Sequence, residues 1–135
     1  MELVVSFPDG KKVDAQLNGH IIRTDQPVKA GGEDSAPAPF DLFLASIGTC
    51  AGIYIKGFCS SRGLPTDNIK IIQKMNYNTV THLIDGIDLD IQVPPDFPEK
   101  YKSAVINAAE LCAVKKHLQN PPKFNIQTSV LNNIG

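Results

Sequence analysis

The 135-residue sequence predicts a single α+β domain rather than a wound parallel sheet. Two observations predict this class. Short alternating segments occur in a group of three and a group of two, which is typical of antiparallel sheets. A long apolar segment with helix-start and helix-stop signals separates the two groups, and a second helical segment follows them. The predicted order is three strands, a helix, two strands, one or two helices and a last strand.

Three antiparallel strands are expected at the N-terminus, over residues 2–7, 11–17 and 20–24. A Pro-Asp-Gly turn separates the first two strands, and Asn18-Gly19 gives a hairpin signal between the second and third. The following segment, 25–38, contains two prolines, two glycines and three acidic residues. This composition predicts a loop.

The clearest element is a helix over residues 39–62. Pro39 suits a first helical turn, and Asp41 places a negative charge near the positive helix end. Gly63 and Pro65 supply the stop. The helix is apolar nearly all round, so we expect it to be central and buried. Small residues on one side, at 45, 46, 48, 51 and 52, would let another backbone approach. Its uncharged stretch, residues 42–55, is shorter than the ~20 residues that span a bilayer.

The second half of the chain predicts two strands, a helical region and a last strand. The strands cover residues 68–78 and 82–93, and Pro94-Pro95 ends the second. Asp96 and Glu99 have the spacing of a capping box at the start of a helix. Its apolar stripe extends to Cys112. Residues 120–122, Asn-Pro-Pro, break the chain before a strand expected over 123–131.

Composition excludes several classes of protein. The net charge is −1 and the basic residues are scattered, so neither nucleic acid nor a membrane surface is an expected partner. Three cysteines without a secreted spacing argue against a disulfide scaffold, and the N-terminus has no signal-peptide pattern. We therefore expect a cytoplasmic protein. The histidines and cysteines lack zinc-site spacing, and there is no phosphate-binding or dinucleotide motif, so no metal or cofactor is expected.

Two thiols, Cys50 and Cys112, lie in separate helix-like contexts and could meet in the folded chain. Two such thiols can exchange a disulfide, which is the minimum equipment of a thiol peroxidase. An ordinary thiol has a pKa of about 8.5, so a peroxidatic cysteine needs a lower one. Cys50 lies too deep in its helix for the helix dipole to act, so we expect a cation from elsewhere. The structural alternative is that both cysteines fill space in the core. Cys59 points away from Cys50 and is expected to be a packed thiol.

The segment TDQPVKAGGEDSAPAPFDLFLASIGTCAGIYIKGFCSSRG, together with AAELCAVKKHL, resembles the OsmC/Ohr family of peroxide-resistance proteins. The resemblance implies an intertwined homodimer with curved sheets around two central helices. It also implies reduction of small organic hydroperoxides to alcohols by Cys50 and Cys112, with a dithiol reductant and without metal, haem or flavin. In this reading Cys50 becomes a sulfenic acid, and Cys112 resolves it to a disulfide.

The chain departs from the family pattern around the reactive cysteine. Family peroxidases place a glutamate directly after the helix-start proline and pair the cysteine with an arginine. Here Phe40 takes the first position, and Asp41 and Lys29 are the nearest candidates for supporting charges. A proline often follows the second cysteine, where this chain has Ala113.

An apolar substrate pocket is expected over Cys50, formed by Phe40, Phe43 and Ile47. Two alternatives remain beside the peroxidase. One is a non-enzymatic OsmC-like protein that binds an apolar ligand or senses oxidants. The other is a different thiol chemistry such as acyl transfer, which would need a base beside Cys50.

Overall fold

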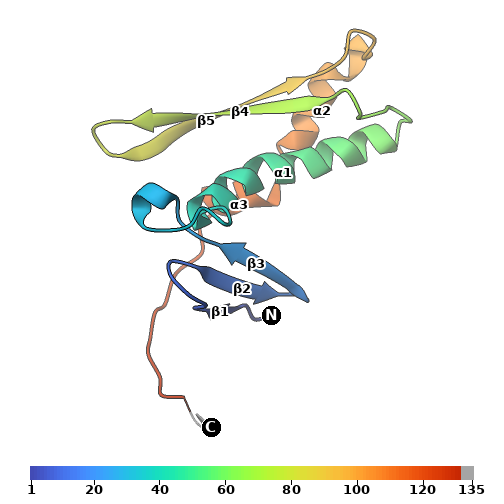
Figure 1. The fold of residues 1–135 in the computed structure, drawn as a ribbon. Helices are drawn as coiled ribbons and strands as arrows, with labels where there is room; N and C mark the ends of the chain where they lie inside the picture. The colour runs from blue at the N-terminus through green and yellow to red at the C-terminus, as the bar shows by residue number, and fades with distance from the viewer. Residues whose placement is uncertain (132–135) are drawn as a thin grey trace.

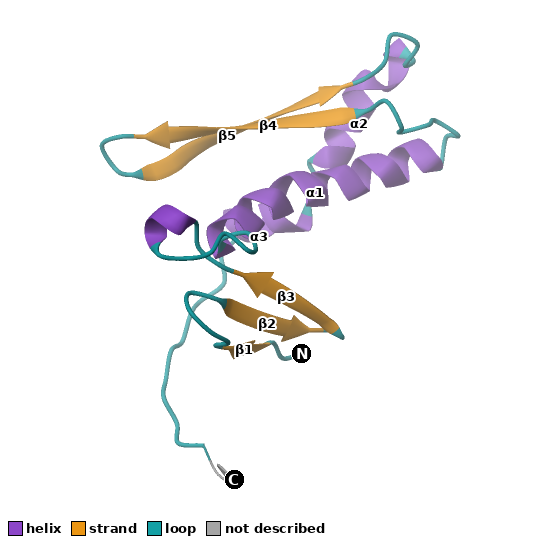
Figure 2. Ribbon diagram, viewed as in Figure 1, coloured by secondary structure: helices purple, strands orange, loops and turns teal. Residues whose placement is uncertain are grey.

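The computed structural model describes residues 1–131 and confirms the α+β class with antiparallel strands. The strands form two separate sheets on opposite sides of the long helix α1 (Figure 1). The β4–β5 hairpin lies on one side, and the three N-terminal strands lie on the other. Figure 2 shows α3 beside the first part of α1, whereas α2 crosses α1 farther along and rises to the level of the β4–β5 hairpin.

The N-terminal sheet consists of β1 (Val4–Ser6), β2 (Val13–Leu17) and β3 (His20–Thr24), in that order. The hairpin signal between β2 and β3 is confirmed, because Asn18 and Gly19 have φ angles of 51° and 80°. Two positive φ values are what a type I′ turn requires. A 3-10 turn, Val28–Ala30, interrupts the predicted loop that follows.

This loop is organised by Asp25, a residue that the sequence analysis did not single out. Its carboxylate accepts backbone N–H bonds from Gln26 (2.7 Å), Glu33 (3.3 Å) and Ser35 (3.1 Å), and a bond from the Ser35 hydroxyl (2.6 Å). The Ser35 hydroxyl, together with these backbone donors, lowers the pKa of Asp25 to about 2. Gly32 is required beside it, because a Cβ there would lie 2.0 Å from the Gln26 carbonyl oxygen.

Helix α1 (Pro39–Ser60) begins with Pro39 in its first turn, as predicted. It ends before Gly63, whose φ is 66°, while the Leu64 N–H bonds to the Cys59 carbonyl at 2.9 Å. The expected all-round burial is wrong for the single chain. One stripe is buried, at Ile47, Ala51, Ile55 and Cys59. The other faces stay open because α2 covers one side of the helix and β4 contacts it only sparsely.

Helix α1 is also long and apolar enough to cross a membrane by length and composition. This is weak evidence, because the central helix of a soluble protein has the same properties.

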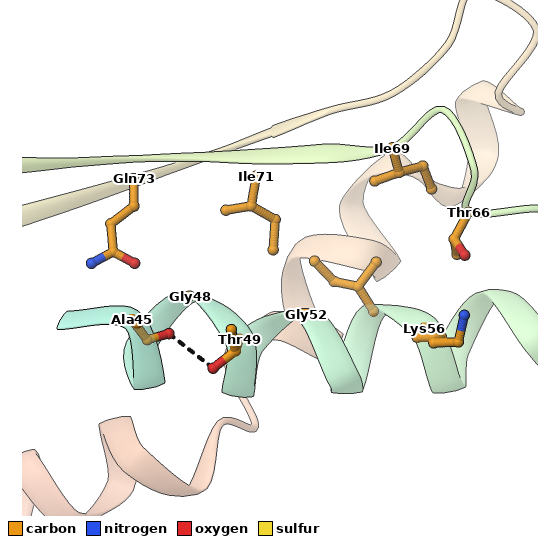
Figure 3. Close-up of a pocket in the computed structure, with 10 residues that line it drawn as sticks. Ala45, Gly48, Thr49, Gly52, Lys56, Thr66, Ile69, Ile71 and Gln73 are labelled. Atoms are coloured by element: carbon orange, nitrogen blue, oxygen red, sulfur yellow. Dashed lines mark hydrogen bonds between the residues drawn. The ribbon is translucent and has the colours of Figure 1, made fainter. Parts of the chain in front are cut away.

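The second sheet is the hairpin of β4 (Lys70–Asn78) and β5 (Leu83–Gln92). Gly48 and Gly52, two of the small residues of α1, face the Gln73 and Ile71 side chains of β4. A Cβ on Gly48 would lie 2.7 Å from the Gln73 side chain, whose amide donates to the Leu44 carbonyl at 3.0 Å. A cavity of about 440 Å³ remains between α1 and β4 (Figure 3).

Two short helices close the described fold, α2 (Lys102–Ala109) and α3 (Ala113–Gln119). Ile55 and Cys59 of α1 pack with Phe97 and Val105 to form the core between α1 and α2. The predicted capping box does not form. A 3-10 turn, Glu99–Tyr101, precedes α2 instead, with Pro98 at its cap and no side-chain cap bond, because two prolines at 95 and 98 restrict the entry to the helix.

The strand expected over 123–131 is wrong for this chain, since residues 121–131 carry no assigned secondary structure. The alternation that suggested it is present, but a strand forms only where a neighbour supplies backbone hydrogen bonds. Its apolar side chains are largely exposed: Phe124 is 83%, Ile126 96%, Val130 87% and Leu131 77% exposed.

Candidate functional site

The fold brings Cys50 and Cys112 together. Cys50 is half-buried on α1, and Cys112 is the buried residue that caps the start of α3. It therefore lies between two helices, not within one as the sequence suggested. Their side chains are close enough for a hydrogen bond between the two thiols. The α1–α2 core sets this approach, because α2 ends three residues before Cys112.

Backbone groups at the start of α3 stabilise the thiolate of Cys50. The pKa of Cys50 is lowered first by the backbone N–H of Val114, then by the Cys112 side chain and the N–H of Ala113, while burial opposes them. The first N–H groups of a helix have no partner within the helix, so they are free to donate to a sulfur. Within residues 1–131, the groups that lower this pKa are hydrogen-bond donors, and the activating cation stays a prediction.

The pKa of Cys112 shifts in the opposite direction. Burial is the main reason that its pKa is raised, and the side chain and charge of Cys50 raise it further, against the backbone N–H groups of Lys115 and Val114. Cys112 is only 2% exposed. The two shifts favour the thiolate on Cys50 and the proton on Cys112, whose S–H can donate to the Cys50 sulfur.

The predicted supporting charges do not reach this pair. Asp41 lies in the first turn of α1, nine residues before Cys50 and hence on the opposite face. Lys29 lies exposed in the 3-10 turn of the N-terminal loop. Neither side chain contributes to the pKa shift of Cys50.

The predicted apolar pocket is partly assembled. Phe40 and Phe43 stack on each other at 5.6 Å between ring centroids, and both are exposed. Phe43, Ile47 and Cys50 follow one stripe of α1, but Phe43 and Ile47 line different cavities. Phe40 lines neither of them.

These two cavities adjoin helix α3, and we name them by their walls; Cys50 lines neither of them. The α3 cavity, of about 390 Å³, is almost wholly apolar and includes Ala113 and Val114, whose N–H groups face Cys50. Its other walls are Phe43, His117, Leu118, Pro121, Pro122 and Phe124. The β5 cavity, of about 440 Å³, includes Cys112 and lies against β5 and α2.

The third cysteine and two of the histidines have other neighbours in the structure. Cys59 is fully buried in the core, and burial raises its pKa, as expected of a packed thiol. Among residues 1–131 there is no group of three side chains that could hold a metal ion. His82 contacts the Tyr77 hydroxyl at 3.1 Å, and His117 bonds the Ala113 carbonyl at 2.7 Å.

The comparison with protein families decides the identity of the fold. Residues 32–127, which include α1, both thiols and the hairpin between them, match the model of the OsmC-like protein family. The chain belongs to the OsmC-like protein family.

Solved structures agree with this assignment. The OsmC-like chain superposes with a TM-score of 0.69 on a protein from Psychrobacter arcticus 273-4, whose name refers to osmotic stress induction and detoxification response. The two share 20% identity over 84% of this chain and 85% of the other. A hypothetical protein from Aquifex aeolicus VF5 gives a TM-score of 0.62 at 18% identity, covering 89% and 87%.

An organic hydroperoxide resistance protein OsmC from Legionella pneumophila gives a TM-score of 0.53 at 15% identity, covering 88% of this chain and 90% of that chain. At these identities the likeness shows the fold. No curated protein matches the sequence.

In this OsmC-like site, the sequence did not predict that the backbone N–H groups of Ala113 and Val114 lower the pKa of Cys50. Sequence reasoning examined charged side chains, whereas the donors are backbone groups, which every residue except proline possesses. The available signal was the position of Cys112 immediately before a helical run, AVKKHLQ. That signal locates a helix start but not its distance from Cys50.

Proposed function

We propose that this OsmC-like protein reduces organic hydroperoxides with Cys50 and Cys112, within the redox or peroxide-resistance role that its family and its Legionella neighbour indicate. The observation that carries the proposal is the contact between two thiols whose pKa values shift in opposite directions. One sulfur is prepared as a nucleophile, and its neighbour keeps a proton.

The reaction follows from this asymmetry. The Cys50 thiolate attacks the terminal peroxide oxygen, the O–O bond breaks, and the alkoxide takes a proton from the solvent to leave as an alcohol. Cys50 becomes a sulfenic acid. The Cys112 sulfur then attacks the Cys50 sulfur and loses its proton, and hydroxide leaves as water, which gives the disulfide. A dithiol reduces the disulfide and returns both thiols.

The α3 cavity supports an organic rather than an inorganic peroxide. It adjoins the N–H groups that face Cys50, and its walls are aromatic and aliphatic. Such walls would hold an apolar tail while the peroxide group reaches the thiolate. Hydrogen peroxide has no tail to bind there.

The test measures peroxide consumption by the reduced protein with dithiothreitol, using cumene hydroperoxide and hydrogen peroxide in parallel. The Cys50→Ser variant should lose turnover of both, and Cys112→Ser should complete one turnover and then stop. Cys59→Ser is the matched control and should retain turnover, because Cys59 lies in the core apart from the pair. Turnover that survives in Cys50→Ser would refute the proposal.

We further propose that the protein works as a cytoplasmic homodimer. The accessible surface of 10660 Å² compares with roughly 6,900 Å² for a compact monomer of this mass. The excess, roughly 3,700 Å² per chain by that scaling, is more than the roughly 1,000–2,500 Å² per chain that obligate dimers commonly cover, so a partner would need to cover only part of it. It includes apolar side chains of the N-terminal sheet, such as Val4, Val5 and Ile21, and of α1, such as Ile53 and Tyr54. The cytoplasm would keep the thiols reduced.

A second candidate function is ligand binding without turnover, as in an oxidant sensor or a carrier of an apolar molecule. The apolar cavities around α1 favour it. This function predicts that an apolar ligand raises the melting temperature of the Cys50→Ser variant as much as that of the wild type, while neither consumes peroxide.

A further inference from the structure

Two cavities adjoin helix α3, and of these two only the β5 cavity has a thiol of the pair in its wall. The α3 cavity adjoins Cys50 through the N–H groups of Ala113 and Val114, whereas the β5 cavity has Cys112 in its wall. Peroxide chemistry uses the Cys50 side. With the peroxide in the α3 cavity, as proposed, the β5 cavity is left for a second substrate that reaches Cys112.

From this arrangement we propose that the reducing dithiol enters through the β5 cavity and attacks Cys112, so that oxidation and reduction use different cavities. The inference rests on the proposed function and deepens it. It assigns the attacked sulfur and the entrance of the second substrate.

The chemistry of exchange supports attack at Cys112. A thiolate attacks a disulfide sulfur in line with the bond that breaks, and the departing sulfur leaves faster when its thiol has a lower pKa. Attack from the β5 cavity on Cys112 makes Cys50 the leaving group. The backbone N–H groups of Val114 and Ala113 stabilise Cys50 as a thiolate, so Cys50 is the better leaving group of the two.

The shape of the β5 cavity selects the reductant. Its volume is about 440 Å³, which suits a small molecule. Most of its walls are aliphatic: Ile47, Ile87, Leu89, Ile91, Ile106 and Leu118. Cys112 is only 2% exposed, so a reductant must enter the cavity to reach its sulfur. Lys115 and Glu110 form an ion pair that gives the same cavity a polar part.

The steps balance in atoms and electrons. One thiolate of the reductant bonds to the Cys112 sulfur, the Cys112–Cys50 bond breaks, and Cys50 departs as a thiolate. The second thiol of the reductant loses its proton and attacks its own partner sulfur in this mixed disulfide. Cys112 leaves and takes up a proton, and the reductant becomes a cyclic disulfide.

The first experiment maps the attacked sulfur. The protein is oxidised to the Cys50–Cys112 disulfide with diamide, so the step does not depend on peroxide turnover. It is mixed briefly with 2-mercaptoethanol, quenched with iodoacetamide and analysed by peptide mass spectrometry. We expect the 2-mercaptoethanol adduct on Cys112 and the alkyl group on Cys50. Adducts on Cys50, or in equal amounts on both, would overturn the inference.

The second experiment blocks each cavity in turn. Ile106→Trp fills the β5 cavity from a residue that is 54% exposed, so the fold should tolerate it. Reduction of the diamide-formed disulfide by dithiothreitol should then slow by about an order of magnitude. Ala113→Phe, which fills the α3 cavity and keeps its backbone N–H, should instead slow oxidation by cumene hydroperoxide.

The two proposals fail in different ways. If Ala113→Phe slows reduction and Ile106→Trp does not, the entrance is wrong although the peroxidase stands. If neither the wild type nor the variants consume peroxide while diamide still forms the disulfide, the proposed function fails. The adduct map then still decides which sulfur is attacked.

Discussion

Truncation of one core side chain gives a quantitative test of how the thiols are brought together. Val105 is 2% exposed and packs from α2 against Ile55 and Cys59 of α1. Val105→Ala removes two methyl groups, worth about 1.6 kcal/mol of transfer free energy at 0.8 kcal/mol each. The cavity left behind adds about 1 kcal/mol. The better helix propensity of alanine returns about 0.5 kcal/mol. The expected net loss in the free energy of unfolding is about 2 kcal/mol.

Chemical denaturation monitored by circular dichroism measures this loss, at equal protein concentration because a dimer makes stability concentration-dependent. Val80→Ala is the matched control. It removes the same two methyl groups from a side chain that is 85% exposed at the β4–β5 turn, so it should cost less than about 0.5 kcal/mol. Equal losses in the two variants would refute the assignment of the core to the α1–α2 contact. A loss of 2 kcal/mol corresponds to a fall in melting temperature of roughly 6–10 °C for a chain of this length.

Three further predictions concern the loop, the thiolate and the assembly. Asp25 has a folded pKa of about 2, below its ordinary value of 3.8, so its contribution to stability is complete above 3.8 and is lost as the pH falls toward 2. In Asp25→Asn the denaturant midpoint of unfolding should therefore be lower at neutral pH, and it should change less between pH 3.8 and pH 2. A variant whose midpoint depends on pH in this range as the wild type's does would contradict the assignment. Ala113→Pro removes one N–H donor at a position where proline fits the first helical turn. Thiolate absorbance should then show a higher Cys50 pKa that stays below the ordinary value, because the larger contribution of the Val114 N–H remains; an unchanged pKa would exclude the Ala113 donor. Sedimentation should give twice the chain mass of 14.6 kDa, and Ile53→Asp, on an exposed part of α1, should shift it toward the monomer. A wild type that sediments as a monomer at all concentrations would refute the dimer.

Much of the fold follows from local sequence signals. Asn18-Gly19 set the β2–β3 turn because both residues adopt positive φ. Pro39 and Gly63 bracket α1 because one fits a helix start and the other a left-handed position after the end. Asp25 escaped notice because its role depends on backbone N–H groups eight to ten residues away, and nothing in the local sequence indicates that they converge.

The last predicted strand also shows the limit of local sequence signals, because there the pattern is present but the strand is not. Alternation in residues 123–131 is a property of the segment, whereas a strand is a property of a pair. Within the described residues, no neighbour supplies the pairing.

The sequence by itself determined the α+β class, the order of the helices and strands from β1 to α3, and the presence of two thiols that could react. These properties depend on periodicity, turns and caps, which act within a few residues. Only the tertiary structure decided that Cys50 meets Cys112 at the start of α3 and that backbone N–H groups stabilise its thiolate. The reason is physical. A pKa depends on what lies within a few ångströms in space, and here those groups are more than 60 residues away along the chain.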